Sequence, residues 1–160
     1  MVTQGDFQRE MRKDEADQVD RLLQRAYGSA APVQLLRKLR KSKVIAGEMV
    51  VPVGDQVIGY YALSKMQMPK GWMCLGPVAI DSDWQGRKQG KRMLGMLSEW
   101  ARISGTYVVA PASTDFCTKA GFSTQRASNL STQNAGPLVL VGPEPAAPDQ
   151  IVTFPKAFLT

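Results

Sequence analysis

One stretch decides the fold of this chain: residues 75–91 read LGPVAIDSDWQGRKQGK. Its first six residues are typical of a buried strand, and the basic, glycine-bearing residues that end it precede a helical pattern. A helix N-terminus exposes unpaired N–H groups and carries about half a positive charge, so a turn of this kind suits a phosphate group. The stretch therefore predicts a strand, a phosphate-binding turn and a helix, and it indicates a phosphorylated ligand.

Two helices and a hairpin are expected before this stretch. Apolar residues from Val19 to Tyr27 share one helix face; Asp14 is placed to cap that helix and Gly28 to end it. Gly54-Asp55 separates two β-rich runs, which is typical of a hairpin. In chain order we expect a strand at 6–11, helices at 14–28 and from Pro32 through Leu39, paired strands at 44–53 and 57–66, and a strand at 72–80.

The segments after the basic turn predict a parallel strand pair. A helix over 89–103 ends at Gly105, and a β-branched strand follows at 106–110. A strand, a helix and a strand in this order favour parallel pairing with a right-handed connection. Met93, Leu94, Leu97, Trp100 and Ala101 would face the sheet. A short helix at 115–120 and further strands at 137–141 and 151–154 complete the expected elements.

Length and composition are those of one globular domain, over 1–160. Hydrophobic residues make up 44% of the 160 residues and charged residues 21%, which does not favour disorder. The start lacks a signal-peptide layout and no apolar run approaches the ~18 residues of a membrane span, so a cytoplasmic protein is expected. The absence of histidine excludes a Ser-His-Asp system, and with Cys74 and Cys117 far apart no metal site is expected.

The net charge of +6 suits a polyanionic partner, which is a nucleic acid, an acidic protein or a phosphorylated cofactor. The basic cluster from Arg37 to Lys43 is either a solvated helix face or a nucleic-acid contact. It lacks interleaved aromatic residues, so nucleic-acid binding is not expected. Gly86 and Gly90 are separated by three residues where a P-loop needs four, so ATP hydrolysis is not supported.

Residues 75–90 resemble the acyl-CoA signature of the Gcn5-related N-acetyltransferase (GNAT) superfamily. That pattern is Gln or Arg, two residues, Gly, one residue, then Gly or Ala. Gln85 and Gly90 match it, whereas Lys88 stands in place of the first glycine. If that position needs a left-handed backbone, the lysine costs about 1–2 kcal/mol. The resemblance covers roughly three quarters of the chain, includes the ending Lys119-Ala120-Gly121-Phe122, and in the tail is similar to a bacterial acetyltransferase branch of uncertain substrate.

The resemblance implies an α/β (α+β) fold: a mixed, mostly antiparallel central sheet flanked by helices, with a splayed parallel strand pair around the acyl-CoA site. It implies acetyl-CoA as cofactor, with the pyrophosphate on the N–H groups of the basic turn. A strand edge would pair with the amides of the pantetheine arm. The implied cofactor-binding residues are Val78, Ala79, Ile80, Gln85, Gly86, Arg87, Lys88, Gln89, Gly90 and Lys91.

The resemblance leaves the catalytic residues of the implied site open. Members of the superfamily commonly carry a tyrosine four residues before the Gly-Phe pair, where it protonates the CoA thiolate; this chain has Cys117 there. Cys117 is a general acid, a nucleophile that forms an acetyl-cysteine, or a buried inert cysteine. The amine acceptor must lose a proton to water or to a carboxylate; the candidates are Glu48, Asp81, Asp83 and Asp115.

Two functions stay open from the sequence. The first is direct transfer of an acetyl group from acetyl-CoA to an amine in a ternary complex, with a small-molecule or peptide amine as acceptor and a homodimer suggested by the resemblance. The second is an acyl-CoA-binding sensor or interaction module that has lost its catalytic acid. Either an acceptor cleft or a core and dimer face would use Tyr60, Tyr61, Met66, Met68 and Trp72.

Overall fold

The computed structural model describes residues 8–85, 88–111, 130–131, 138–143 and 150–159. A six-stranded sheet has the order β1-β2-β3-β4-β5-β7. Its strands are β1 (Arg9–Glu10), β2 (Ile45–Val53), β3 (Gln56–Lys65), β4 (Met73–Ile80), β5 (Val108–Pro111) and β7 (Leu138–Val141). Two short strands, β6 (Leu130–Ser131) and β8 (Gln150–Ile151), form a separate parallel pair.

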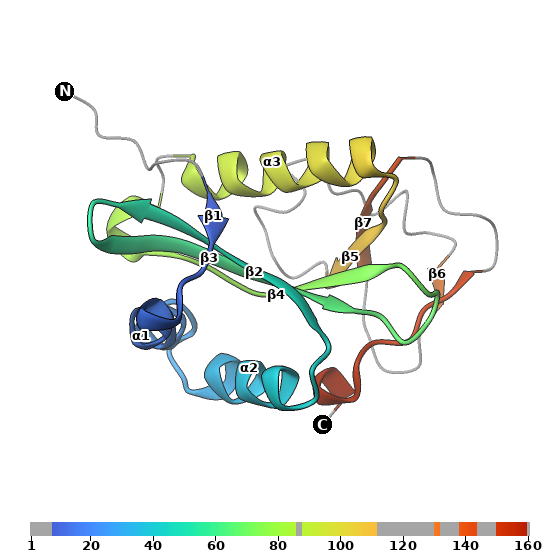
Figure 1. The fold of residues 1–160 in the computed structure, drawn as a ribbon, viewed down its shortest axis with the longest axis horizontal. Helices are drawn as coiled ribbons and strands as arrows, with labels where there is room; N and C mark the ends of the chain where they lie inside the picture. The colour runs from blue at the N-terminus through green and yellow to red at the C-terminus, as the bar shows by residue number, and fades with distance from the viewer. Residues whose placement is uncertain (1–7, 86–87, 112–129, 132–137, 144–149, 160) are drawn as a thin grey trace.

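Helices cover both faces of the sheet (Figure 1). The helices α1 (Ala16–Tyr27) and α2 (Ala31–Lys41) lie on one face, and α3 (Gln89–Ser104) lies on the other. Three short 3-10 helices are η1 (Lys13–Glu15), η2 (Ser82–Trp84) and η3 (Lys156–Leu159). Because side chains alternate along a strand, Tyr60 and Ala62 pack under α1 and α2, whereas Tyr61 and Leu63 pack under α3.

The strand pairings confirm the expected fold class. The pairs β1–β2, β2–β3, β3–β4 and β5–β7 are antiparallel, and only β4–β5 is parallel in the six-stranded sheet. Gly28 and Gly105 end α1 and α3 in left-handed conformations with φ of 67° and 73°, as the sequence predicts. The short helix expected at 115–120 lies outside the described residues.

Two local expectations are wrong. Asp14 does not cap α1, because residues 13–15 form a 3-10 turn and Glu15 takes the N-cap position. Trp100 does not face the sheet: it is 45% exposed, and with Met96 and Ile103 it forms an apolar stripe on the outer face of α3. The helical period placed Trp100 at the margin of the buried face, and packing left it outside.

The parallel pair β4–β5 is short and then opens. Its register consists of Met73 opposite Val108 and Cys74 opposite Val109. On its other side β4 follows β3 as far as Ile80, opposite Gly59, with an irregularity in the register across Gly76-Pro77. From Leu75 to Ile80, therefore, β4 has a strand neighbour on one edge only in the described part of the chain. This is the splayed pair that the sequence resemblance implies.

A buried carboxylate fixes the N-terminal strand to the start of α1. The two terminal nitrogens of Arg9 donate to the two oxygens of Glu15, each at 2.8 Å, and the Arg12 N–H donates to Glu15 Oε1 at 2.8 Å. The Arg9 hydrogen bonds, with help from the Arg12 N–H, hold the pKa of Glu15 at about 2, below its ordinary value of 4.5.

Replacement of this carboxylate should give a pH-dependent loss of stability. The pKa is depressed in the folded state, so the carboxylate stabilises the fold above pH 4.5 and loses this effect as the pH falls towards 2. We expect Glu15→Gln to lower the free energy of unfolding by about 1–3 kcal/mol at pH 7. In urea titrations the difference from wild type should shrink towards pH 2.

Glu99→Gln is the matched control, because Glu99 pairs with Arg102 on the exposed face of α3. We expect it to change the free energy of unfolding by less than about 0.5 kcal/mol at every pH. A loss in Glu15→Gln that stays constant from pH 7 to pH 2 would contradict the role assigned to Arg9.

Candidate functional site

The open edge of β4 is the first part of the candidate site. Peptide groups alternate in direction along a strand, and the Asp81 N–H donates to Ile58 O of β3 at 2.7 Å. Asp81 and Ala79 therefore direct their backbone groups towards β3, and Val78 and Ile80 direct theirs away from it. Of the three predicted cofactor-binding residues on β4, the structure brings Val78 and Ile80 to the open edge.

Two side chains of the protein itself bind the polar groups of this edge. The Tyr27 hydroxyl donates to Val78 O at 2.9 Å and accepts from the Val78 N–H at 3.1 Å. The Gln85 side-chain amide donates to Ile80 O at 3.1 Å. The apolar pattern predicts Tyr27 on the packed face of α1, but the side chain is 50% exposed and its hydroxyl binds the open edge of β4. Its position as the last residue before Gly28 was the available signal.

The predicted turn follows at the end of β4. Gly86 and Arg87 lie outside the described residues. Lys88 is the N-cap of α3 and has a left-handed backbone, with φ of 62° and ψ of 19°. This position therefore does require a left-handed backbone, and the lysine there is strained by about 1–2 kcal/mol.

The first turn of α3 presents amides that have no partner within the helix. The first hydrogen bond of the helix runs from the Arg92 N–H to Lys88 O at 3.0 Å. The N–H groups of Gln89, Gly90 and Lys91 precede it and lack helical partners. Gln89 is buried, Gly90 is half-buried and Lys91 is exposed. Three consecutive donors at the positive end of a helix dipole favour an anion.

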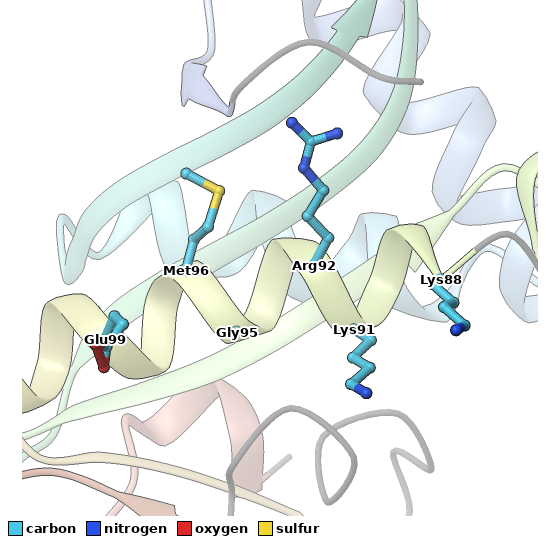
Figure 2. A pocket seen from close by; sticks show the side chains of 6 residues that line it. All are labelled: Lys88, Lys91, Arg92, Gly95, Met96 and Glu99. Carbon is cyan, nitrogen blue, oxygen red and sulfur yellow. The ribbon is translucent and has the colours of Figure 1, made fainter. Parts of the chain in front are cut away.

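A surface hollow of about 620 Å³ continues from this turn along α3. It is lined by Lys88, Lys91, Arg92, Gly95, Met96 and Glu99. In Figure 2, Lys88 and Lys91 extend towards one side of α3, and Arg92 and Met96 towards the other. Three cations and one carboxylate make the hollow electropositive, which suits a polyanionic group.

An ion pair connects the end of β4 with α1. The buried Asp81 accepts from Arg25 at 2.9 Å and from the Asp83 N–H at 2.9 Å. One carboxylate thus caps the 3-10 turn η2, which leads to the basic turn, and binds the last turn of α1. Arg25 and Tyr27 together place the end of α1 against β4.

The described base candidates are held by other contacts. Glu48 accepts from Arg40 and from the Tyr60 hydroxyl, each at 2.7 Å. Burial, followed by the charge of Glu48, raises the pKa of Tyr60 above its ordinary value. Asp81 is bound to Arg25, and Asp83 is exposed at the turn. Asp115 lies outside the described residues.

The two cysteines differ in what the structure says of them. Cys117, the predicted catalytic residue, lies outside the described residues. Cys74 is buried at the parallel pairing of β4 and β5, and burial raises the pKa of its thiol to about 12. Cys74 is therefore a core residue and not a nucleophile.

The residues expected either at an acceptor cleft or in a core are divided by the structure. Tyr60, Tyr61 and Met66 are buried in the core. Trp72 stacks on Tyr107 with ring centroids 4.6 Å apart, and Met68 is exposed.

The described residues contain neither a metal-ligand cluster nor a membrane-spanning helix. No group of three or more His, Cys, Asp or Glu side chains there is placed to hold a metal ion. None of the described helices combines the length and the apolar character needed to cross a membrane.

Two bacterial structures are among the solved structures with the same fold. A GNAT family N-acetyltransferase from Escherichia coli, in complex with CoA, has a TM-score of 0.86 at 20% identity, over 100% of this chain and 94% of that one. A GNAT family acetyltransferase from Brucella melitensis, in complex with acetyl-CoA, has a TM-score of 0.76 at 20% identity, over 95% and 97% of the two chains. This likeness shows the fold.

One family model matches the segment that contains both the central strands and the start of α3. No functionally curated protein matches the sequence at a significant level. The model of the Acetyltransferase (GNAT) family matches residues 16–122, which extend from the start of α1 beyond the end of β5. The matched segment contains the open edge of β4, the left-handed Lys88 and the first turn of α3. The chain therefore belongs to the Acetyltransferase (GNAT) family.

Proposed function

We propose that this protein is an N-acetyltransferase that moves an acetyl group from acetyl-CoA to an amine in a ternary complex. The observation that carries the proposal is the continuity of two features: the open edge of β4 leads directly to the unpaired amides at the start of α3. The first suits the amide-containing arm of CoA and the second its pyrophosphate. The CoA and acetyl-CoA complexes of the two bacterial structures support this assignment.

The pyrophosphate would lie at the basic turn. Hydrogen bonds to a charged partner contribute about 1.5–3 kcal/mol each, so the amides of Gln89, Gly90 and Lys91 can offset the strain at Lys88. The ammonium groups of Lys88 and Lys91 add charge on one side of α3 (Figure 2). The predicted contributions of Gln85, Gly86 and Arg87 belong to the same proposal.

The pantetheine arm would run back along β4. The four steps of strand from Ile80 to Gly76 span about 13 Å, which brings the thioester towards the point where β4 and β5 separate. The backbone groups of Val78 and Ile80 would bind the amides of the arm. The arm must then replace the Tyr27 hydroxyl at Val78.

Transfer requires one bond exchange and two proton movements. The neutral amine nitrogen attacks the thioester carbonyl, the C–S bond breaks, and the acetyl group stays on nitrogen. The amine proton passes to water or to Asp83 or Asp115, since the other two candidates, Glu48 and Asp81, are already held by arginines. Cys117 is our candidate for the acid that protonates the CoA thiolate. Holding both reactants supplies most of the acceleration.

The acceptor class and the oligomer are part of the proposal. A small-molecule or peptide amine is the acceptor. The apolar stripe of Met96, Trp100 and Ile103 on α3 supports a homodimer, because burial in a second copy would remove it from water.

A specific observation favours a second function. Val78, whose backbone would bind the arm, is engaged by Tyr27, and the position of the usual acid holds a cysteine. A protein with these features could bind acyl-CoA as a sensor without turnover. Binding and turnover distinguish the two functions.

The proposal is tested by calorimetry with CoA and by release of CoA thiol from acetyl-CoA across a panel of amines. We expect Gly90→Leu to abolish CoA binding and leave the fold intact, because a side chain at this position enters the phosphate seat while leucine itself suits a helix. Gly47→Leu is the control, since a Cβ there meets nothing within 4 Å. Binding without thiol release would favour the sensor; unchanged affinity in Gly90→Leu would refute the seat.

Removal of the Tyr27 hydroxyl should strengthen binding. In the free protein this hydroxyl makes two hydrogen bonds to Val78, each worth about 0.5–1.5 kcal/mol, which the pantetheine arm must replace. We expect Tyr27→Phe to bind CoA about 5–150-fold more tightly in calorimetry, which is the effect of about 1–3 kcal/mol. Tyr107→Phe, which alters a tyrosine stacked on Trp72, should leave the affinity unchanged. Weaker binding by Tyr27→Phe would mean that the hydroxyl itself contacts the cofactor.

Replacement of Lys88 by glycine should raise the stability of the fold and weaken CoA binding. We expect Lys88→Gly to raise the free energy of unfolding by about 0.5–1 kcal/mol, because glycine relieves the left-handed strain at φ 62°. The same change should weaken CoA binding several-fold at low salt, with a smaller effect at high salt. Urea titration and calorimetry at two salt concentrations measure both. A lower free energy of unfolding in Lys88→Gly would contradict the backbone strain assigned to Lys88.

A further inference from the structure

A second hollow lies on the opposite side of the molecule from α3. It is bounded by the end of α2, the end of β3 and the C-terminal segment, and its volume is about 750 Å³. That volume is in the range of small-molecule sites. We call it the lysine pocket; its lining consists of Lys38, Lys41, Ser42, Val44, Gln67, Pro155, Lys156 and Ala157. Neither the signature of residues 75–90 nor the α3 hollow includes any of these residues.

The charge of the lysine pocket has one sign. Three lysines line it, and no carboxylate is among the described residues of its wall. The carboxylates that face α2 are already paired: Asp20 with Arg37 at 3.7 Å and Glu48 with Arg40 at 2.7 Å. In the described part of the chain neither Lys41 nor Lys156 has a salt bridge. A surface hollow lined by charges of one sign concentrates anions.

The helix dipole does not account for this arrangement. Basic residues in the last turn of α2 complement its negative end, which would explain Lys38 and Lys41. Lys156, however, belongs to η3, which packs against α2 from the far end of the sequence. Lys43 adds charge nearby, because it lies between Ser42 and Val44 of the pocket wall. Segments distant in sequence thus bring cations to one place.

The walls of the pocket are held in position by hydrogen bonds. The Gln67 backbone N–H donates to Thr153 O at 2.8 Å, and its side-chain amide donates to Phe154 O at 2.7 Å. These bonds fasten the C-terminal segment to the end of β3. Val44, Pro155, Ala157 and the lysine methylenes give the wall an apolar surface.

We propose that the lysine pocket binds a small anionic ligand, a phosphate monoester or a carboxylate attached to an apolar group. The ammonium groups recognise the anion as point charges, and the apolar wall accommodates the body of the ligand. This site is separate from the proposed CoA seat. The ligand would lie close to β4, because Phe158, next to Ala157, has its ring 3.6 Å from the Cβ position of Gly76.

The experiment is calorimetry of the full chain with three probes of one shape: phenyl phosphate, benzoate and phenol. We expect an anion to bind at least about tenfold more tightly than phenol, with phenyl phosphate ahead if the site suits phosphate and benzoate ahead if it suits carboxylate. The NMR signals of the Val44 and Gln67 amides should shift with the bound anion. Equal weakness of all three probes overturns the proposal.

Paired variants locate the binding. We expect Lys41→Ala with Lys156→Ala to weaken the anion at least about tenfold. Lys13→Ala with Lys70→Ala removes the same charge from exposed lysines outside the pocket and should retain the affinity. Anion binding that survives in the first variant, or is lost equally in both, overturns the proposal. CoA binding measured in parallel should be the same in both variants, so failure of the lysine pocket and failure of the proposed CoA seat are separate results.

Discussion

The unpaired edge of β4 is the constraint on which the rest of the structure depends. A strand in the middle of a sheet normally has both edges bound, and an unpaired peptide group away from water is costly. Here β4 keeps β3 along its whole length and shares only two residue pairs with β5. The remaining edge needs partners, and the protein supplies them from Tyr27 and Gln85. A ligand with peptide-like amides can take their place.

The end of α1 therefore has more than a packing role. Its last turn contributes Arg25 to the buried carboxylate of Asp81 and Tyr27 to the edge at Val78. The two contacted residues, Val78 and Asp81, lie three positions apart, where β4 ends and the turn towards α3 begins. Movement of α1 would disturb the strand edge and the turn together. The site is thus built from one helix on each face of the sheet.

Apolar periodicity predicted the helices and strands well, because burial of one face determines both. The helix ends at Gly28 and Gly105 were also readable, since they depend on local backbone geometry, whereas the left-handed backbone at Lys88 was only a condition raised by the family resemblance. The contact of Tyr27 was not readable, because its partner Val78 is distant in sequence. The N-cap at Glu15 was missed because residues 13–15 form a 3-10 turn, which apolar periodicity does not signal. Trp100 shows the limit of periodicity, which cannot say how wide the buried face is.

The burial of Cys74 has a practical consequence for solution work. Its thiol is enclosed by the core and burial raises its pKa to about 12, so we expect it to be protected from alkylating reagents while the protein is folded. The chain contains two cysteines. A thiol label that the folded protein takes up would therefore report on Cys117 and not on Cys74.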